Sequence, residues 1–381
     1  MSQAAFLFDT PVALAPATTP AARGQRRPRP AGIDDTAFEI GWDFAHYRLT
    51  PPVAHLHADN PVRQGWSAGR ASFGSRTLKP SPAVRRWLQL RLAAWQRGQA
   101  FESVQVTPHF LAQLEVARCP VTCQALGRDD EAADASVIER LNGRAAYAAG
   151  NLAMLSNVAR QALAGHDCRA ALSYAERIDA GEQPQFHGLD GDQWRRLAVL
   201  ASFATPLPHA EAAALPLVVL PPNRVRVLNP VQALQVMLTL QFCQAGYARR
   251  LVALAALMPS SAARQAFQVF MHTLLARRMA AGPVLDDDAM RSAMQSAWHD
   301  ALVQRRWARL ATLLDEADCE RLLQRAARRG LLGASQRWHS ASQATEGWAL
   351  DPAGAPLAGV PDQDSAMPAT DGVVSANAMS H

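Results

Sequence analysis

The stretch Ala146-Tyr-Ala-Ala-Gly-Asn-Leu-Ala-Met-Leu-Ser156 decides the local fold in the N-terminal half of this chain. It follows a second short stretch, Ala135-Ser-Val-Ile-Glu-Arg-Leu-Asn142. Each contains a brief apolar run, and the Gly-Asn pair between the two runs is a turn signal. We therefore predict two antiparallel strands, Ser136 to Leu141 and Asn151 to Leu155, followed directly by a helix to Leu163.

Helical sequence flanks this segment on its N-terminal side. Ser81-Pro82 supplies an N-cap and a proline at the first helical position, and the helix that starts there ends at Gly98. A second helix opens with Thr107-Pro108. The stretch from Pro51 to Pro80 contains several Gly-aromatic and Gly-Arg pairs, so we expect turns there.

The chain returns to helix after Gly165 and keeps a helical apolar period from Pro230 onward. The predicted fold class is therefore mainly α, with a small ββα insertion in the N-terminal half and a helical bundle in the C-terminal half. We expect a disordered basic arm, an N-terminal domain, a helical C-terminal domain and a disordered acidic tail, at residues 1–35, 36–165, 166–335 and 340–381.

Charge is distributed unevenly along the chain. Between Arg23 and Arg97 there are thirteen Lys or Arg and five Asp or Glu, whereas residues 340–381 hold five acids and no Lys or Arg. Lys79 is the only lysine, so nearly all the positive charge is guanidinium, which bonds phosphate bidentately and stacks on bases. An Arg-rich coding bias would explain the choice of Arg over Lys, but it would not explain the clustering.

Composition indicates a soluble, cytoplasmic protein. No apolar run approaches the roughly 18 residues that a membrane helix requires, so no membrane association is predicted. The five cysteines are too few and too scattered for a disulfide framework. The N-terminus has no basic residue before its weak apolar stretch, which argues against a secretory signal.

Residues 119–163, which we call the ββα element, resemble the HNH nucleases, the ββα-metal, treble-clef-like endonucleases. The similarity is to the branch that writes its first strand as Ser-x-Asp-Arg-hydrophobic and its second as Gly-Tyr-x-x-Gly-Asn. The matching residues are Cys119-Pro, Ser136, Arg140, Asn142, Tyr147, Gly150-Asn151-Leu152 and Ser156.

This resemblance implies a metal site between the first strand and the helix, with Asn151 bracing the loop between the strands. Glu139 stands where the branch has Asp, and Arg160 stands where a His or Asn ligand is expected. A guanidinium repels a cation, so we expect a degenerate element in which Glu139 pairs with Arg140 and Arg160. Within the ββα element, Glu139 and Asn151 are the catalytic candidates. No cofactor is predicted, and a divalent metal would be needed only if the element were active.

Family members with structural zinc use two Cys pairs. Cys119-x-x-x-Cys123 has no second pair, because Ser156 and Ala159 occupy the region where it would fall. We therefore predict no zinc, with Cys119 buried at a turn. His55-Leu-His57 would place two imidazoles on one face of a strand, either as metal ligands or as half-buried loop residues.

The function favoured by these patterns is binding of DNA or RNA. Predicted nucleic-acid contacts are Arg85, Arg86, Arg91, Arg97, Arg140 and Arg160. Two alternatives stay open. The chain is a helical scaffold without a nucleic-acid role, or it is an active metal-dependent endonuclease in which a histidine outside the motif, His109 or His166, serves as base. No protein partner, pathway or oligomeric state is indicated.

Overall fold

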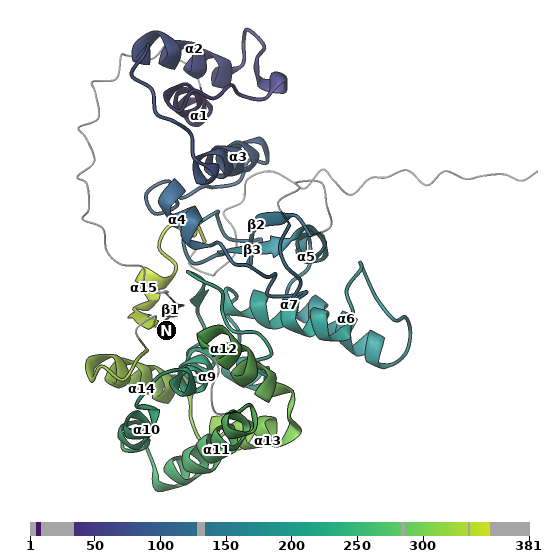
Figure 1. The fold of residues 1–381 in the computed structure, drawn as a ribbon, viewed down its shortest axis with the longest axis vertical. Coiled ribbons are helices and arrows are strands. Elements are labelled where there is room, and N and C mark those ends of the chain that lie inside the picture. The colour runs from purple at the N-terminus through teal and green to yellow at the C-terminus, as the bar shows by residue number, and fades with distance from the viewer. Residues whose placement is uncertain (1–4, 9–33, 128–133, 283–285, 334–335, 351–381) are drawn as a thin grey trace, which may run out of the picture.

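A computed structural model describes residues 5–8, 34–127, 134–282, 286–333 and 336–350 (Figure 1). The described residues contain fifteen α-helices and only two small sheets, which confirms the mainly α fold class. Most of the expected basic arm, and the acidic tail beyond Leu350, lie outside the described residues.

The N-terminal helices α1 (Asp35–His46), α2 (Pro61–Phe73) and α3 (Pro82–Gln96) share a small core of their own. Helix α2 occupies the stretch for which we expected turns, so that prediction is wrong. Its glycines are contact residues: a Cβ on Gly65 would lie 1.9 Å from the carbonyl oxygen of Phe38 on α1. The two backbones touch, and only glycine permits this approach.

The ββα element folds as predicted from the sequence. Strand β2 (Ser136–Arg140) pairs antiparallel with β3 (Leu152–Ser156), and α5 (Asn157–Leu163) follows β3 directly. One face of the hairpin packs on a core shared with α3 and α4 (Pro108–Gln113), while Ala153 and Leu155 face the main core. In Figure 1 the element lies midway along the molecule, with α3 on one side and α7 on the other.

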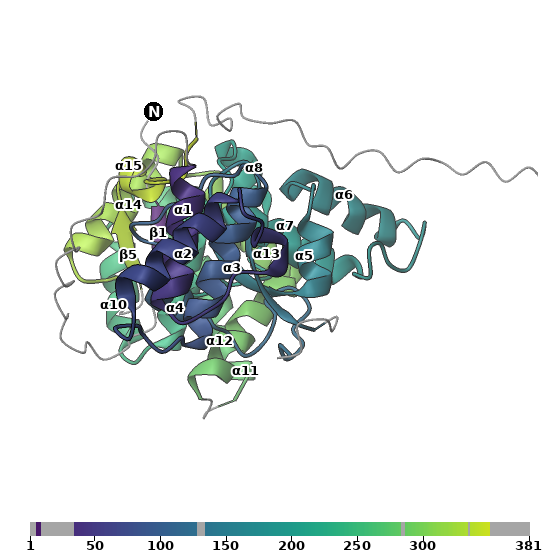
Figure 2. The same ribbon diagram turned by 90° about the horizontal axis from the view of Figure 1, so that it is seen from above.

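The C-terminal half is a helical bundle, with α1 and α2 at the opposite end of the long axis (Figure 1). Helix α6 projects sideways from the body in both views (Figures 1 and 2). The helices are α6 (Cys168–Asp179), α7 (Gly191–Phe203), α8 (His209–Ala214), α9 (Pro230–Leu240), α10 (Tyr247–Ala255), α11 (Ser261–Ala280), α12 (Asp287–Ser296), α13 (Ala301–Ala311) and α14 (Glu316–Arg328), with 3-10 turns at Val53–His55, Gln241–Cys243 and Ala297–His299.

A three-stranded sheet of order β4-β1-β5 joins both ends of the chain to the bundle. Strand β1 (Ala5–Phe8) pairs antiparallel with β4 (Arg226–Val227) and with β5 (Gln336–His339). The expectation of disorder is therefore wrong for Ala5–Phe8. It is also wrong at the start of the tail, where α15 (Ala341–Ala344) and a fully buried Trp348 follow β5.

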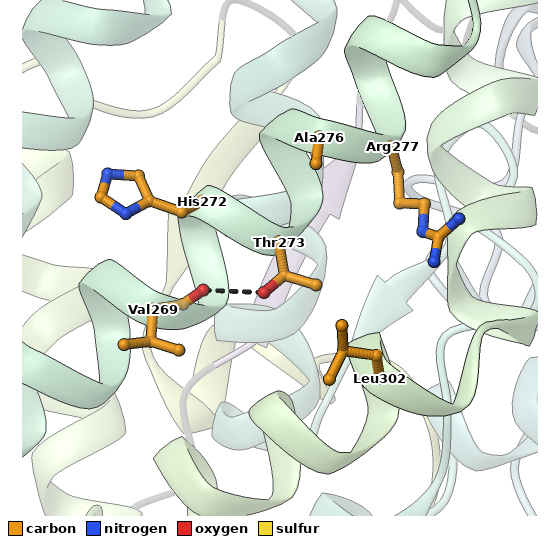
Figure 3. Close-up of a pocket in the computed structure, with 6 residues that line it drawn as sticks. All are labelled: Val269, His272, Thr273, Ala276, Arg277 and Leu302. Atoms are coloured by element: carbon orange, nitrogen blue, oxygen red, sulfur yellow. Dashed lines mark hydrogen bonds between the residues drawn. The ribbon is translucent and has the colours of Figure 1, made fainter.

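A surface pocket of about 550 Å³ lies between α11 and α13 (Figure 3). Its two ionisable lining residues, His272 and Arg277, lie on opposite sides of it, and Arg277 pairs with Asp300. The pocket is remote from the ββα element. None of the helices in the described part of the chain combines the length and apolar character of a membrane span.

Candidate nucleic-acid interface

Asn151 braces the connection between β2 and β3. Its side chain is fully buried. Its Oδ1 accepts a hydrogen bond from the Asn142 amide (2.8 Å), and its Nδ2 donates to the carbonyl oxygens of Asn142 (3.1 Å) and Ala146 (3.0 Å). The Gly-Asn turn predicted this position, and the bracing role is the one that the resemblance implied. The partners of this buried side chain are backbone groups of the loop, whose path it therefore fixes.

Glu139 lies on β2 opposite Ala153, and its side chain is 18% exposed. Its Oε1 accepts a hydrogen bond from the Arg140 amide (2.9 Å) and lies 3.9 Å from Arg140 Nε. The predicted second partner is placed elsewhere. Arg160 on α5 donates from Nε and Nη2 to Asn157 Oδ1, at 3.2 and 2.9 Å.

Tyr147 connects arginines from two different elements. Arg97, the C-cap of α3, donates to the Tyr147 hydroxyl (3.0 Å), and the Arg140 guanidinium lies 4.7 Å from the centre of the tyrosine ring. Burial, and then the nearby Glu139 carboxylate, raise the pKa of Tyr147, so the phenol stays neutral and does not offset the two positive charges. The sequence included Tyr147 in the resemblance but gave it no role.

Arg86 attaches the other end of α3 to the start of β2. Its Nη1 lies 2.7 Å from Glu115 Oε1, and its Nη2 donates to Ser136 Oγ (3.4 Å). Arg85, one residue earlier, is exposed. Helix α3 therefore contacts the start of β2 through Arg86, at Ser136, and the β2–β3 connection through Arg97, at Tyr147.

Arg91 is a correction to the predicted contact set. Its side chain is only 7% exposed, ion-pairs with Asp43 on α1 and lies 4.0 Å from Glu39. Its guanidinium also covers the Trp87 ring at 4.6 Å. A buried, paired guanidinium is not available to a phosphate, so Arg91 joins α1 to α3 and contributes nothing to an exposed surface.

The predicted buried turn at Cys119 is confirmed. Cys119 Sγ accepts hydrogen bonds from the backbone amide (3.3 Å) and hydroxyl (3.4 Å) of Ser156, the N-cap of α5. Burial alone would raise the pKa of this thiol, but hydrogen bonds from Ser156 and Thr122 hold it below its ordinary value. Polar hydrogens at positions 122 and 156 thus surround the sulfur, while Cys123 is exposed with a φ of 59°.

The structure places His55 and His57 differently from the metal hypothesis. His55 ends a 3-10 turn and contacts Gln96, so it does not share a strand face with the exposed His57. His166 is held between Ala162 O (3.0 Å) and the Tyr174 hydroxyl (3.2 Å), in an aromatic cluster with Tyr174 and Trp194. Within the described residues, no three His, Cys, Asp or Glu side chains group closely enough to hold a metal ion.

A further charge feature, a long stretch without acidic residues, was not recognised from the sequence. Asn60 to Phe101, from the start of α2 to just beyond α3, contains no Asp or Glu. The eight cations of this acid-free run are Arg63, Arg70, Arg76, Lys79, Arg85, Arg86, Arg91 and Arg97. Counting both signs in a moving window would have found it.

Comparison with protein-family models, with curated proteins and with solved structures found no match to this chain. The resemblance to the HNH nucleases therefore rests on residues 119–163 themselves.

Proposed function

We propose that this chain binds nucleic acid along the exposed arginines of α3 and the adjoining ββα element, without cutting the phosphate backbone. The observation that carries the proposal is the attachment of α3 to the ββα element by two arginines of the acid-free run, Arg86 at the start of β2 and Arg97 at Tyr147 in the β2–β3 connection. Guanidinium groups fixed on neighbouring rigid elements present a constant spacing of positive charge. Such an array binds phosphates without reading sequence.

The chemistry of the element favours binding over cleavage. A one-metal nuclease needs a divalent cation against the leaving oxygen and a base beside the attacking water. Glu139 already accepts a hydrogen bond from Arg140, and the ligand position on α5 holds a guanidinium. These residues fit a divalent metal poorly. The five cysteines are free thiols, which fits the proposed cytoplasmic setting.

The proposal is tested by fluorescence anisotropy with labelled DNA and RNA over a range of salt starting at about 50 mM. We expect weak binding that falls steeply with salt. R85A/R86A/R97A should lower affinity for all sequences and flatten the log–log salt slope by about one unit per lost phosphate contact. The matched control is R305A/R306A/R309A on α13, which should leave both quantities unchanged.

No binding at low salt, or equal losses in both triple variants, would overturn the proposal in favour of a helical scaffold. DNA incubated with magnesium, manganese or zinc should remain uncut. Metal-dependent nicking that disappears in E139Q would instead establish the active endonuclease.

A further inference from the structure

A ladder of half-exposed aromatic rings follows the contact between α1 and α2, two helices that run parallel as the pairs Phe38–Gly65, Trp42–Gly69 and His46–Phe73 show. Trp42 lies 6.3 Å from Phe38 and 5.1 Å from Phe73, and His46 stacks on Phe73 at 4.5 Å with 13° between the ring planes. Tyr47 continues the row at 5.1 Å from His46. All five rings are partly exposed. We call these five residues the aromatic ladder.

Three of the five ladder residues lie on one stripe of α1. The stripe with Ala37, Ile40 and Phe44 is buried in the core shared with α3. Gly41 faces α2, because a Cβ there would lie 1.9 Å from Val62 O. The third stripe, at positions 38, 42 and 46, borders the contact with α2, where Trp42 and His46 pack against Phe73 and all three side chains stay half-exposed.

Three cations flank the His46 end of the ladder. Arg48 donates to the Thr77 hydroxyl and Arg76 donates to the Ser72 carbonyl, and both are exposed, as is Lys79. The Leu78 amide donates to His46 O (2.8 Å), which holds this loop against the end of α1. Hydroxyl and carbonyl acceptors carry no net charge, and among the described residues no carboxylate forms an ion pair with Arg48 or Arg76.

We propose that the aromatic ladder and its three flanking cations bind single-stranded nucleic acid, with bases stacked on the rings and phosphates on Arg48, Arg76 and Lys79. This inference rests on the proposed function and names its substrate class. Exposed bases stack on aromatic side chains in single strands, whereas a duplex hides the base faces. The positive flank matches a phosphate chain.

The position of the ladder supports the same occupant. Phe73 of the aromatic ladder lies in the acid-free run, which leads from α2 through α3, and α3 lies between the α1–α2 pair and the ββα element (Figure 1). An extended strand following this run would meet the cations of the α2–α3 connection and then those of α3. A compact protein partner would use only one end of it.

The test compares affinity for a labelled oligothymidine with affinity for a duplex of equal length. W42L keeps an apolar side chain but removes the ring. It should weaken oligothymidine binding by at least about fivefold, while W42F, which restores a ring, should bind nearly as wild type. Duplex affinity should change less than about twofold in W42L. R76A/K79A, which changes two exposed positions, should also weaken oligothymidine binding. Circular dichroism should show that the helix content of this variant is unchanged.

Each outcome decides between the proposals. If R85A/R86A/R97A weakens binding but W42L and R76A/K79A do not, the proposed function stands and the ladder is not a binding surface. If W42L weakens single-strand and duplex binding equally, stacking is excluded. A third outcome is that polyglutamate binds the wild type, and that R76A/K79A abolishes polyglutamate binding but leaves oligothymidine binding unchanged. The surface would then bind an acidic protein. If no nucleic acid binds, both proposals fall.

Discussion

Three backbone groups of the β2–β3 connection depend on one buried side chain, that of Asn151. The Asn142 amide and the carbonyl oxygens of Asn142 and Ala146 all bond to it. A buried backbone group left without a partner costs about 1–3 kcal/mol, so Asn151 is worth several times an exposed polar side chain. Its role in the element is to fix the path of the loop.

We expect Asn151→Ala to lower the free energy of unfolding by about 3 kcal/mol, because several buried groups lose their partner together. Asn157→Ala is the control, since Asn157 Oδ1 bonds only the Arg160 side chain and its loss should cost under about 0.5 kcal/mol. Urea unfolding followed by tryptophan fluorescence measures both. Equal costs would show that the loop does not depend on Asn151.

Predictability at this scale divides between Asn151 and Arg91. The first lies in a local Gly-Asn turn whose geometry the sequence determines, so its place was predicted. The second lies on the same helical face as Val84 and Leu88, a pattern that already indicated burial. Its partner Asp43 lies 48 residues earlier, and single-sequence patterns do not reveal such long-range pairs.

At the scale of the element, glycine decides how α1 and α2 pack. Alanine favours an isolated helix over glycine by about 1 kcal/mol, so local propensity would select Ala at position 65. A Cβ at that position would meet the Phe38 backbone at 1.9 Å, and a backbone atom has no alternative rotamer to adopt. The close contact with α1 therefore outweighs helix propensity in the choice of residue at position 65. The same glycines that suggested turns are required for the packing of α1 against α2.

Gly65→Ala should therefore lower the free energy of separating α1 from α2 by at least about 2 kcal/mol, despite the gain in helix propensity. Hydrogen exchange should rise across residues 35–73 and stay unchanged in the C-terminal bundle. Gly143→Ala is the matched control, because open space surrounds the Cβ position there and no exchange should change. Unaltered hydrogen exchange in Gly65→Ala would contradict this prediction, because it would mean that α1 and α2 accommodate the added Cβ without loss of stability.

The ββα element was predictable because strand, turn, strand and helix follow one another within a short stretch. The β4-β1-β5 sheet was not, because its strands are two to four residues long and pair the two ends of the chain. Alternation over so few residues carries almost no signal. The helix starts predicted at Ser81-Pro82 and at Thr107-Pro108 are confirmed, because a capping side chain marks each of them.

At the scale of the whole molecule, the segment after β5 packs against the β2–β3 connection of the ββα element. The Ala146 amide donates to Trp348 O (2.8 Å), and Trp348 Nε1 donates to Ala149 O (3.0 Å). Arg226 of β4 donates to the carbonyl oxygens of Gln343 and Ala344, at 3.0 and 2.8 Å. The loop that Asn151 braces from within is thus supported from outside by a residue about 200 positions away.

Trp348→Ala should cost about 3–5 kcal/mol, the usual range for emptying a fully buried aromatic site. Trp348→Phe keeps most of the packing and loses only the hydrogen bond to Ala149, so it should cost about 1 kcal/mol. The decisive readout is hydrogen exchange at the Ala146 amide, which should accelerate in the alanine variant and hardly change in the phenylalanine variant. If Trp348→Ala loosened only residues 336–350 and left the Ala146 amide protected, the C-terminal segment would be a passive cover. The ββα element would then hold its loop through Asn151 alone.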